Sequence, residues 1–238
     1  MPGSLVFGAA TSDRATHTNT GLDNLANFTY IMWVYVTTLT NLRMLCAKDN
    51  GAASEIFFAL DGTGGNVQLQ VGRATANAYA KTNDTPIGAS AWRCIAGTWD
   101  NGTNPPRIWS GTLSAAMAER GYAATPTAGS GAQKDDSART FMWGSDAATL
   151  ALQGRIAVAA IFGSALSSAD LNSWKKRPRK TVGSNVALRF VRFGKGAANG
   201  IEYAAGDNAS VTGATEGNGV PLWQGEDSRI FSPHLRAA

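Results

Sequence analysis

Residues of the kind that enzymes and metal sites depend on are scarce in this 238-residue chain. It has two histidines and two cysteines, and charged residues make up only 16% of it. A structural zinc site needs clustered Cys and His ligands, and a Ser/His/Asp triad needs a histidine beside its nucleophile. Both histidines, His17 and His234, lie in polar terminal segments. The sequence therefore argues against a zinc site and against a triad hydrolase.

Long apolar runs and a targeting segment are also lacking. No stretch approaches the ~20 apolar residues that a membrane-spanning helix needs. The N-terminal residues carry neither the basic nor the apolar region of a secretory signal. The net charge of +4 is well short of a nucleic-acid-binding composition. We therefore expect no signal peptide and no transmembrane segment, and neither a membrane nor a nucleic acid as partner.

The two cysteines, Cys46 and Cys94, each lie in an apolar stretch with strand-like alternation. Free cysteine in such a place behaves as a small buried hydrophobe. Because nothing in the chain marks an oxidising compartment, we expect two reduced thiols, with a disulfide between them as the alternative.

Glycine, in contrast, is abundant, at 27 residues. Many glycines and few charges suit short strands joined by tight turns. Sandwiches of about 200–250 residues often form a single domain, so one large core is expected.

The clearest strand pattern lies in residues 91–111. Both faces of its first strand are largely apolar at period two, with one face formed by Trp92, Cys94, Ala96 and Thr98 and the other by Ile95, Gly97 and Trp99. Residues 100–106 form a turn into a second strand at 107–109. A strand covered on both faces implies two packed layers, and we expect Trp92 to fill the space between two sheets.

Other strands follow from the same alternation. They are predicted at residues 5–7, as an edge strand, and at 28–36, 42–47, 56–60, 67–71, 140–143, 153–162 and 186–193. The glycine-rich residues 61–66 read as a hairpin turn, because a phosphate loop would need a Lys-Ser/Thr pair and a following helix. Gln68 and Gln70 define a polar, solvated face.

One helix is predicted, at residues 167–177. Ser167 can cap it with Asp170 three residues on, Leu166 can pack on Leu171, and Pro178 ends it. Residues 113–137 are small, polar and rich in turn formers, which is typical of a long surface connection.

The hairpin at 91–111 resembles the signature hairpin of the laminin G-like, concanavalin A-like jelly-roll domains. The matching residues are Trp92, Ala96, Gly97, Thr98, Trp99, Asp100 and Gly111. Trp109-Ser110 departs from the residues that usually precede the last glycine in the family. A second block, from Phe141 to Ser167, also resembles the family, and the resemblance covers about residues 5–172. It implies an all-β, two-sheet antiparallel jelly-roll sandwich with one short helix and a C-terminal extension.

Three parts of the chain are expected within this fold. Residues 1–172 would form the laminin G-like sandwich. Residues 173–220 would add the end of the helix, a basic run and returning strands to the same domain. Residues 221–238 would form an extended tail that lies on a partner.

The family's glucanases use a Glu-x-Asp-x-x-Glu array, because a strand places alternate carboxylates on one face. No such array occurs among the glutamates of this chain, which are Glu55, Glu119, Glu202, Glu216 and Glu226. We therefore expect no catalytic residue and no enzymatic activity.

Three binding roles remain open. Related domains often hold Ca²⁺ in loops, and calcium is possible here at the loop aspartates Asp13, Asp49, Asp100 and Asp146. We favour the interpretation that these are acidic residues of turns without a metal, so no cofactor is expected. Sugar binding needs exposed aromatic rings with polar neighbours, and the candidates are Trp99, Trp109 and Tyr79, although Trp in a sandwich more often belongs to the core. A partner could bind the basic run of Lys175, Lys176, Arg177, Arg179 and Lys180, although such a run is usually a solvated helix end.

Fold alone does not decide function, because this sandwich hosts enzymes, lectins and structural modules. We favour a non-catalytic structural protein at the surface of a tailed-phage virion, a decoration or tail component assembled in the host cytoplasm. Its partners would be other virion or assembly proteins, or further copies of the chain. The alternative is a soluble carbohydrate-binding, lectin-like module with glycans as partners. A diverged glycoside hydrolase is the weakest hypothesis.

Overall fold

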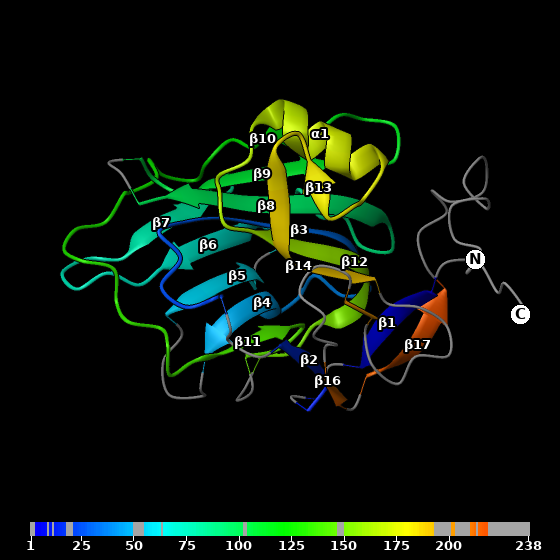
Figure 1. Ribbon diagram of the computed structural model, residues 1–238. Helices are drawn as coiled ribbons and strands as arrows, with labels where there is room; N and C mark the ends of the chain where they lie inside the picture. The colour runs from blue at the N-terminus through cyan, green and yellow to red at the C-terminus, as the bar shows by residue number, and fades with distance from the viewer. Residues whose placement is uncertain are drawn as a thin grey trace, which may run out of the picture.

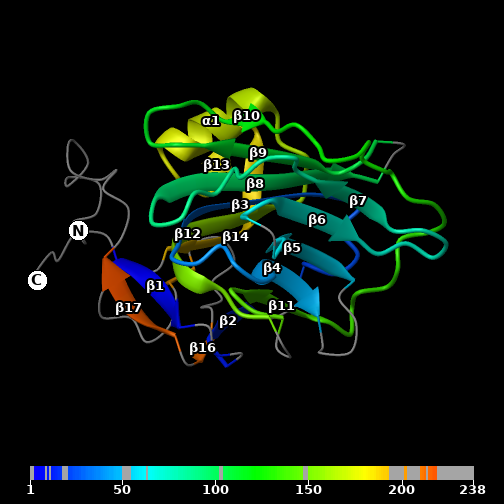
Figure 2. The same cartoon turned by 180° about the vertical axis from the view of Figure 1, so that it is seen from behind.

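The computed structural model describes residues 3–8, 10, 12–17, 21–49, 55–62, 64–101, 104–146, 150–192, 201–202, 210–212 and 214–218. Two antiparallel sheets lie face to face, and a short helix covers the outside of one of them (Figures 1 and 2). This confirms the all-β, two-sheet jelly roll with one short helix. The predicted tail at 221–238 lies outside the described residues.

The first sheet runs in the order β10-β9-β8-β3-β12-β1-β17, with β14 also paired to β12. Its strands are β1 (Gly3–Gly8), β3 (Asn27–Val36), β8 (Trp92–Asp100), β9 (Arg107–Gly111), β10 (Ala118–Glu119), β12 (Gln153–Phe162), β13 (Thr181–Val182), β14 (Asn185–Arg192), β15 (Ile201–Glu202) and β17 (Thr215–Asn218). The second sheet runs in the order β16-β2-β11-β4-β5-β6-β7. Its strands are β2 (Arg14–His17), β4 (Arg43–Asp49), β5 (Ile56–Leu60), β6 (Val67–Val71), β7 (Ala78–Lys81), β11 (Thr140–Trp143) and β16 (Ser210–Thr212).

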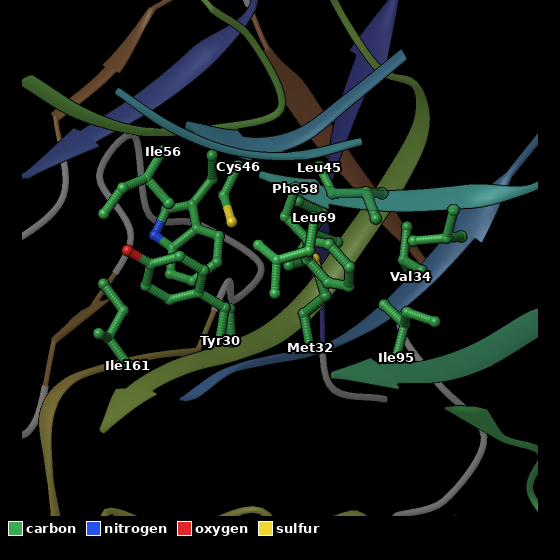
Figure 3. Packing of buried hydrophobic residues seen from close by; sticks show 14 of the residues in the cluster. Tyr30, Met32, Val34, Leu45, Cys46, Ile56, Phe58, Leu69, Ile95 and Ile161 are labelled. Carbon is green, nitrogen blue, oxygen red and sulfur yellow. The ribbon is translucent and has the colours of Figure 1, made fainter. Parts of the chain in front are cut away.

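The main core lies between the sheets. Alternate side chains of β3, from Phe28 to Val36, point into it and are fully buried or nearly so. Figure 3 shows Tyr30, Met32 and Val34 of this strand facing side chains of the second sheet, among them Phe58 and Leu69. The period-two alternation in the sequence thus identifies the inward face of β3 correctly.

A second apolar layer covers the outer face of the first sheet. The other side chains of β3, Ile31 and Trp33, pack there against α1 (Ser168–Lys176) and the residues around it. Ser167 caps the helix by accepting a hydrogen bond from the backbone N–H of Asp170, as predicted. The indole N–H of Trp33 donates to the carbonyl oxygen of Lys175 at 3.3 Å, which ties the end of the helix to the sheet.

The cysteines are free and fully buried, as expected. Cys46 lies in the core between the sheets and Cys94 in the layer beneath α1, so the first sheet separates them. Burial raises the pKa of both thiols well above the usual value of 9.0. The prediction of two free, buried thiols is thus confirmed, and their inertness toward thiol reagents stays a prediction.

Trp92 does not fill the space between the sheets, contrary to expectation. It is half-buried and packs with Tyr35 on the helix side of the first sheet, at a ring separation of 5.6 Å. The residues of β8 that enter the main core are Ile95 and Trp99. The alternation separates the two faces of the strand correctly, but both faces are apolar, so it does not say which of them meets the other sheet.

Two further predictions about edges and surfaces are wrong. The strand at 5–7 is not at an edge, because β1 pairs with β12 on one side and with β17 on the other. Gln68 is only 9% exposed, and its side-chain oxygen accepts a hydrogen bond from the hydroxyl of Tyr79 at 3.0 Å. Both differences arise from segments distant in sequence that cover these residues.

The long connection after β9 has more structure than predicted. Residues 122–133 run antiparallel beside β7 and the turn before it, through isolated bridges such as Tyr79 to Thr127 and Thr82 to Tyr122. This pairing covers backbone groups that β7 would otherwise present at the sheet edge. Among the described residues, no helix is both long and apolar enough to cross a membrane.

Candidate functional site

A hollow of about 390 Å³ lies at the turn end of the β8–β9 hairpin, next to the start of α1. We call it the tryptophan hollow. Its lining residues are Thr98, Trp99, Asp100, Asn104, Pro105, Arg107, Trp109, Ala165, Leu166, Ser167 and Ser168. Five of these eleven residues lie on β8 or β9, and the ladder between the two strands pairs Thr98 with Arg107 and Ala96 with Trp109.

Trp109 is the aromatic side chain of the hollow with an accessible surface. It is half-buried, and it packs at the margin of the apolar layer beneath α1. Its indole N–H donates to the hydroxyl of Thr98 at 3.2 Å, which fixes the ring on the neighbouring strand. A ring held in this way offers an apolar surface on which a sugar can stack.

Polar side chains surround this ring. The amide nitrogen of Asn104 lies 3.4 Å and 3.3 Å from the two carboxylate oxygens of Asp100. Arg107 is 51% exposed and lies 3.6 Å from a carboxylate oxygen of Glu119, a long contact between exposed groups. Carboxylate, amide and guanidinium groups beside an aromatic ring are the set that orients sugar hydroxyls.

Trp99, a predicted stacking residue, does not fulfil that role. Although it is among the lining residues, its side chain is only 1% exposed and belongs to the main core. Its ring lies 5.6 Å from that of Phe28, and the guanidinium of Arg73 lies 6.0 Å from its centre. Inward-facing position 99 and outward-facing position 109 carry the same residue type, and only the fold distinguishes them.

Tyr79, the third predicted aromatic, lies elsewhere. It is on β7 of the second sheet, where its hydroxyl donates to Gln68. Burial raises the pKa of its phenol above the usual value of 10.0. The structure therefore does not bring Tyr79 together with Trp109.

The predicted calcium aspartates do not gather at one place. Asp13 accepts a hydrogen bond from the backbone N–H of Gly8 at 2.6 Å, and Asp146 accepts one from that of Leu150 at 2.8 Å. Asp100 belongs to the tryptophan hollow, and the side chain of Asp49 lies outside the described residues. In the described part of the chain, no three His, Cys, Asp or Glu side chains are grouped so that they could hold a metal ion. Asp13 and Asp146 accept these hydrogen bonds from backbone N–H groups close by in the chain, and both are buried rather than at the surface.

The basic run is divided by burial. Lys175 is 3% exposed, and its ammonium group donates to the carbonyl oxygens of Thr112 at 2.8 Å and Ala115 at 2.6 Å. Because its side chain is buried and its ammonium group is bonded within the chain, Lys175 does not present its charge at the surface as the sequence prediction required. Burial also lowers the pKa of this lysine. The other four residues are exposed: Lys176, Arg177, Arg179 and Lys180.

His17 also lies in an unexpected place. It is only 3% exposed and packs against Trp143, at a ring separation of 6.4 Å and nearly edge-on. The polar residues around it in the sequence suggested a surface segment, but β2 places it on the second sheet. His234 is outside the described residues.

A buried charge cluster around Lys48 was missed by sequence reasoning. Its ammonium group donates to Asp136 at 2.7 Å, to Asp23 at 2.6 Å and to the carbonyl oxygen of Leu22 at 2.8 Å. Lys48 is 1% exposed and Asp136 is fully buried. These partners are 25 and 88 residues away along the chain, so no local pattern could reveal them. The cluster fixes the loops around the core and is structural.

Comparison with known proteins supports the fold. The sequence model of the concanavalin A-like lectin/glucanases superfamily matches residues 9–172. Among curated proteins, none matches the sequence.

Several solved structures share the fold at low sequence identity. A putative carbohydrate binding protein from Bacteroides ovatus is 12% identical, with a TM-score of 0.61, and the match covers 92% of this chain but 60% of that one. A SAP-like pentraxin from Limulus polyphemus is 9% identical, with a TM-score of 0.53, over 89% of this chain and 96% of that one. Tailspike protein 2 from Escherichia coli O157:H7 bacteriophage CAB120 is 13% identical, with a TM-score of 0.55, over 79% of this chain and 26% of that one.

Proposed function

The chain belongs to the concanavalin A-like lectin/glucanase superfamily, and from that membership we propose that it is a non-catalytic carbohydrate-binding module whose sugar occupies the tryptophan hollow. One observation carries the proposal, the half-buried ring of Trp109 with Asp100, Asn104 and Arg107 around one hollow. The ring would stack on the apolar face of a sugar, and the polar groups would orient its hydroxyls. The similarity to a putative carbohydrate binding protein is consistent with this function.

The absence of catalysis is part of the proposal. Glycosidases need two carboxyl groups, ~5–5.5 Å apart in retaining enzymes and ~6.5–9.5 Å apart in inverting ones. Of the described residues that line the tryptophan hollow, only Asp100 has a carboxylate. A single carboxylate can accept hydrogen bonds from a sugar, but it cannot supply both of the carboxyl groups that either mechanism needs.

A glycan array on the intact chain tests the proposal. We expect binding to a limited set of glycans, with at least tenfold weaker binding for Trp109→Ala and no release of reducing sugar from any bound glycan. Leu113→Ala is the matched control, because Leu113 is a large exposed apolar residue, at 44% exposure, outside the lining. Equal binding by the wild type, Trp109→Ala and Leu113→Ala would contradict the proposed site.

A second candidate function is a structural role on a tailed-phage virion surface, with other virion proteins as partners. Its support is the exposed part of the basic run, where four cations lie within five residues: Lys176, Arg177, Arg179 and Lys180. The match to a phage tailspike covers a minor part of that protein and concerns the fold alone. Particle binding that is lost when these four residues are changed to Gln, while glycan binding stays absent throughout, would favour this candidate over the first.

A further inference from the structure

A second hollow, of about 340 Å³, lies at the opposite end of the β8–β9 pair. Its lining residues are Thr85, Pro86, Arg93, Ser110, Gly111, Thr112, Ala115, Ala116, Ala118 and Arg120. We propose that this arginine hollow binds a carboxylate or sulfate group through the guanidinium of Arg93. The proposal does not depend on the sugar site, because the two hollows share no lining residue.

Arg93 is the central cation of this hollow. It lies on β8, where it pairs with Val34 of β3, and its side chain is half-buried. One of its terminal nitrogens donates to the carbonyl oxygen of Trp92 at 3.1 Å. In the described part of the chain, no carboxylate forms an ion pair with Arg93. A partly desolvated guanidinium with further N–H donors is a site that an oxyanion can complete.

The charges around Arg93 are mostly positive. Arg120 is held in place by its backbone N–H, which donates to Ile108 at 2.9 Å, and its guanidinium pairs with Asp84. The ammonium group of Lys175 holds the loop at 112–115 from beneath. The lining therefore carries two cations, Arg93 and Arg120, and because Asp84 pairs with Arg120, the positive charge of Arg93 is left without a partner among the described residues of the hollow.

Small and hydroxyl-bearing residues complete the lining. Ser110, Thr85 and Thr112 carry hydroxyl groups, and that of Thr112 accepts a hydrogen bond from the backbone N–H of Ala115 at 2.8 Å. A Cβ atom at Gly111 would lie 3.0 Å from the carbonyl oxygen of Ala116, so glycine allows the loop after β9 to fold closely over the strand end. The volume lies within the range of about 300–1,000 Å³ that small-molecule sites occupy.

The anionic group could be a free ion or part of an acidic sugar, such as a uronic acid or a sulfated residue. Both present the same oxygens to a guanidinium, and a bidentate contact suits either. The experiment therefore uses both sources.

Calorimetric titration with millimolar sodium sulfate, at an ionic strength held constant with sodium chloride, tests the site on the intact chain. We expect sulfate binding that Arg93→Gln weakens at least about tenfold, as the loss of a charge-assisted hydrogen bond predicts. Arg93→Lys should bind sulfate with intermediate affinity, because lysine keeps the positive charge but lacks the planar guanidinium that donates two parallel hydrogen bonds. Arg14→Gln is the matched control, since it removes the same charge from a half-buried site on β2, outside the lining.

The second arm compares a sulfated and a uronate-containing oligosaccharide with a neutral one. If either acidic sugar binds and Arg93→Gln weakens that binding, the site recognises acidic glycans. If only sulfate binds, the site recognises a small anion. The proposal would be overturned if Arg93→Gln and Arg14→Gln reduced the sulfate affinity equally, or if the intact chain bound no sulfate. Trp109→Ala should leave sulfate binding unchanged, so failure of this site is distinguishable from failure of the sugar site.

Discussion

Trp109 and Thr98 are joined across the β8–β9 ladder, where the indole N–H of Trp109 donates to the hydroxyl oxygen of Thr98 at 3.2 Å. The hydrogen bond uses the polar edge of the ring, and the ring is among the residues that line the tryptophan hollow. Substitutions at the two positions should therefore have different effects. A change at Thr98 loosens the indole ring, whereas a change at Trp109 removes it.

Thr98→Val is therefore expected to weaken glycan binding less than Trp109→Ala does. Valine has nearly the same shape as threonine but accepts no hydrogen bond, so the ring would gain freedom without being lost. We expect a loss of about threefold to tenfold in affinity, since a neutral hydrogen bond contributes about 0.5–1.5 kcal/mol. Titration of a glycan identified on the array measures this, and a loss as large as that of Trp109→Ala would show that Thr98 contacts the sugar itself.

Trp99 and Trp92 should differ in their contributions to stability. Trp99→Ala is expected to lower the free energy of unfolding by about 3–5 kcal/mol, because it removes a buried indole from the main core. Trp92→Ala should cost clearly less, because Trp92 is half-buried on the helix side of the sheet. Chemical denaturation of the two variants decides the order, and a larger loss for Trp92→Ala would contradict the arrangement described above.

Because of its two buried thiols, the chain is expected to lose free energy of unfolding at high pH. Burial raises their pKa in the folded state above the unfolded value, so the folded chain keeps protons that the unfolded chain releases. The stabilisation is fully present below the unfolded pKa and is lost as the pH rises above it, by up to about 1.4 kcal/mol per pH unit for each thiol. The free energy of unfolding of the wild type should therefore fall more steeply above about pH 9 than that of a Cys46→Ala/Cys94→Ala variant.

The same thiols should not react with a thiol reagent at neutral pH without denaturant. In denaturant, both should react at once. Rapid labelling of the native protein would show that at least one of them is accessible, and parallel pH curves for the wild type and the double variant would show that the fold does not perturb their pKa.

Breaking the buried pair of Lys48 and Asp136 should be costly. Lys48→Met leaves the carboxylate of Asp136 buried without its cation, at an expected cost of about 3–5 kcal/mol. Lys48→Met/Asp136→Asn should recover part of this loss, because the fully buried carboxylate of Asp136 is gone and the remaining partner, Asp23, is 36% exposed. Urea denaturation of the two single variants and the double variant measures the coupling energy, and strictly additive losses would mean that the two residues do not stabilise each other.

Much of the architecture could be predicted from local patterns. The alternation of β3 identified its two buried faces, and the spacing of Ser167 and Asp170 identified the start of the helix. Both signals arise within a few residues, since side-chain direction has a fixed period and a cap is formed by neighbours in the chain. The sequence by itself therefore determined the long central strands, the helix and the presence of two packed layers, but not short strands such as β2 and β7.

Only the tertiary structure decided how deeply each residue lies and which residues meet. Trp99 and Trp109 were equal candidates for sugar stacking, and the packing of the second sheet buried one while the other remained at the tryptophan hollow. In the same way, Lys175 is buried against the loop after β9, while its neighbour Lys176 is exposed. Burial depends on segments far away in the chain, such as the loops that cover Lys48 and Lys175, and no periodicity records those contacts.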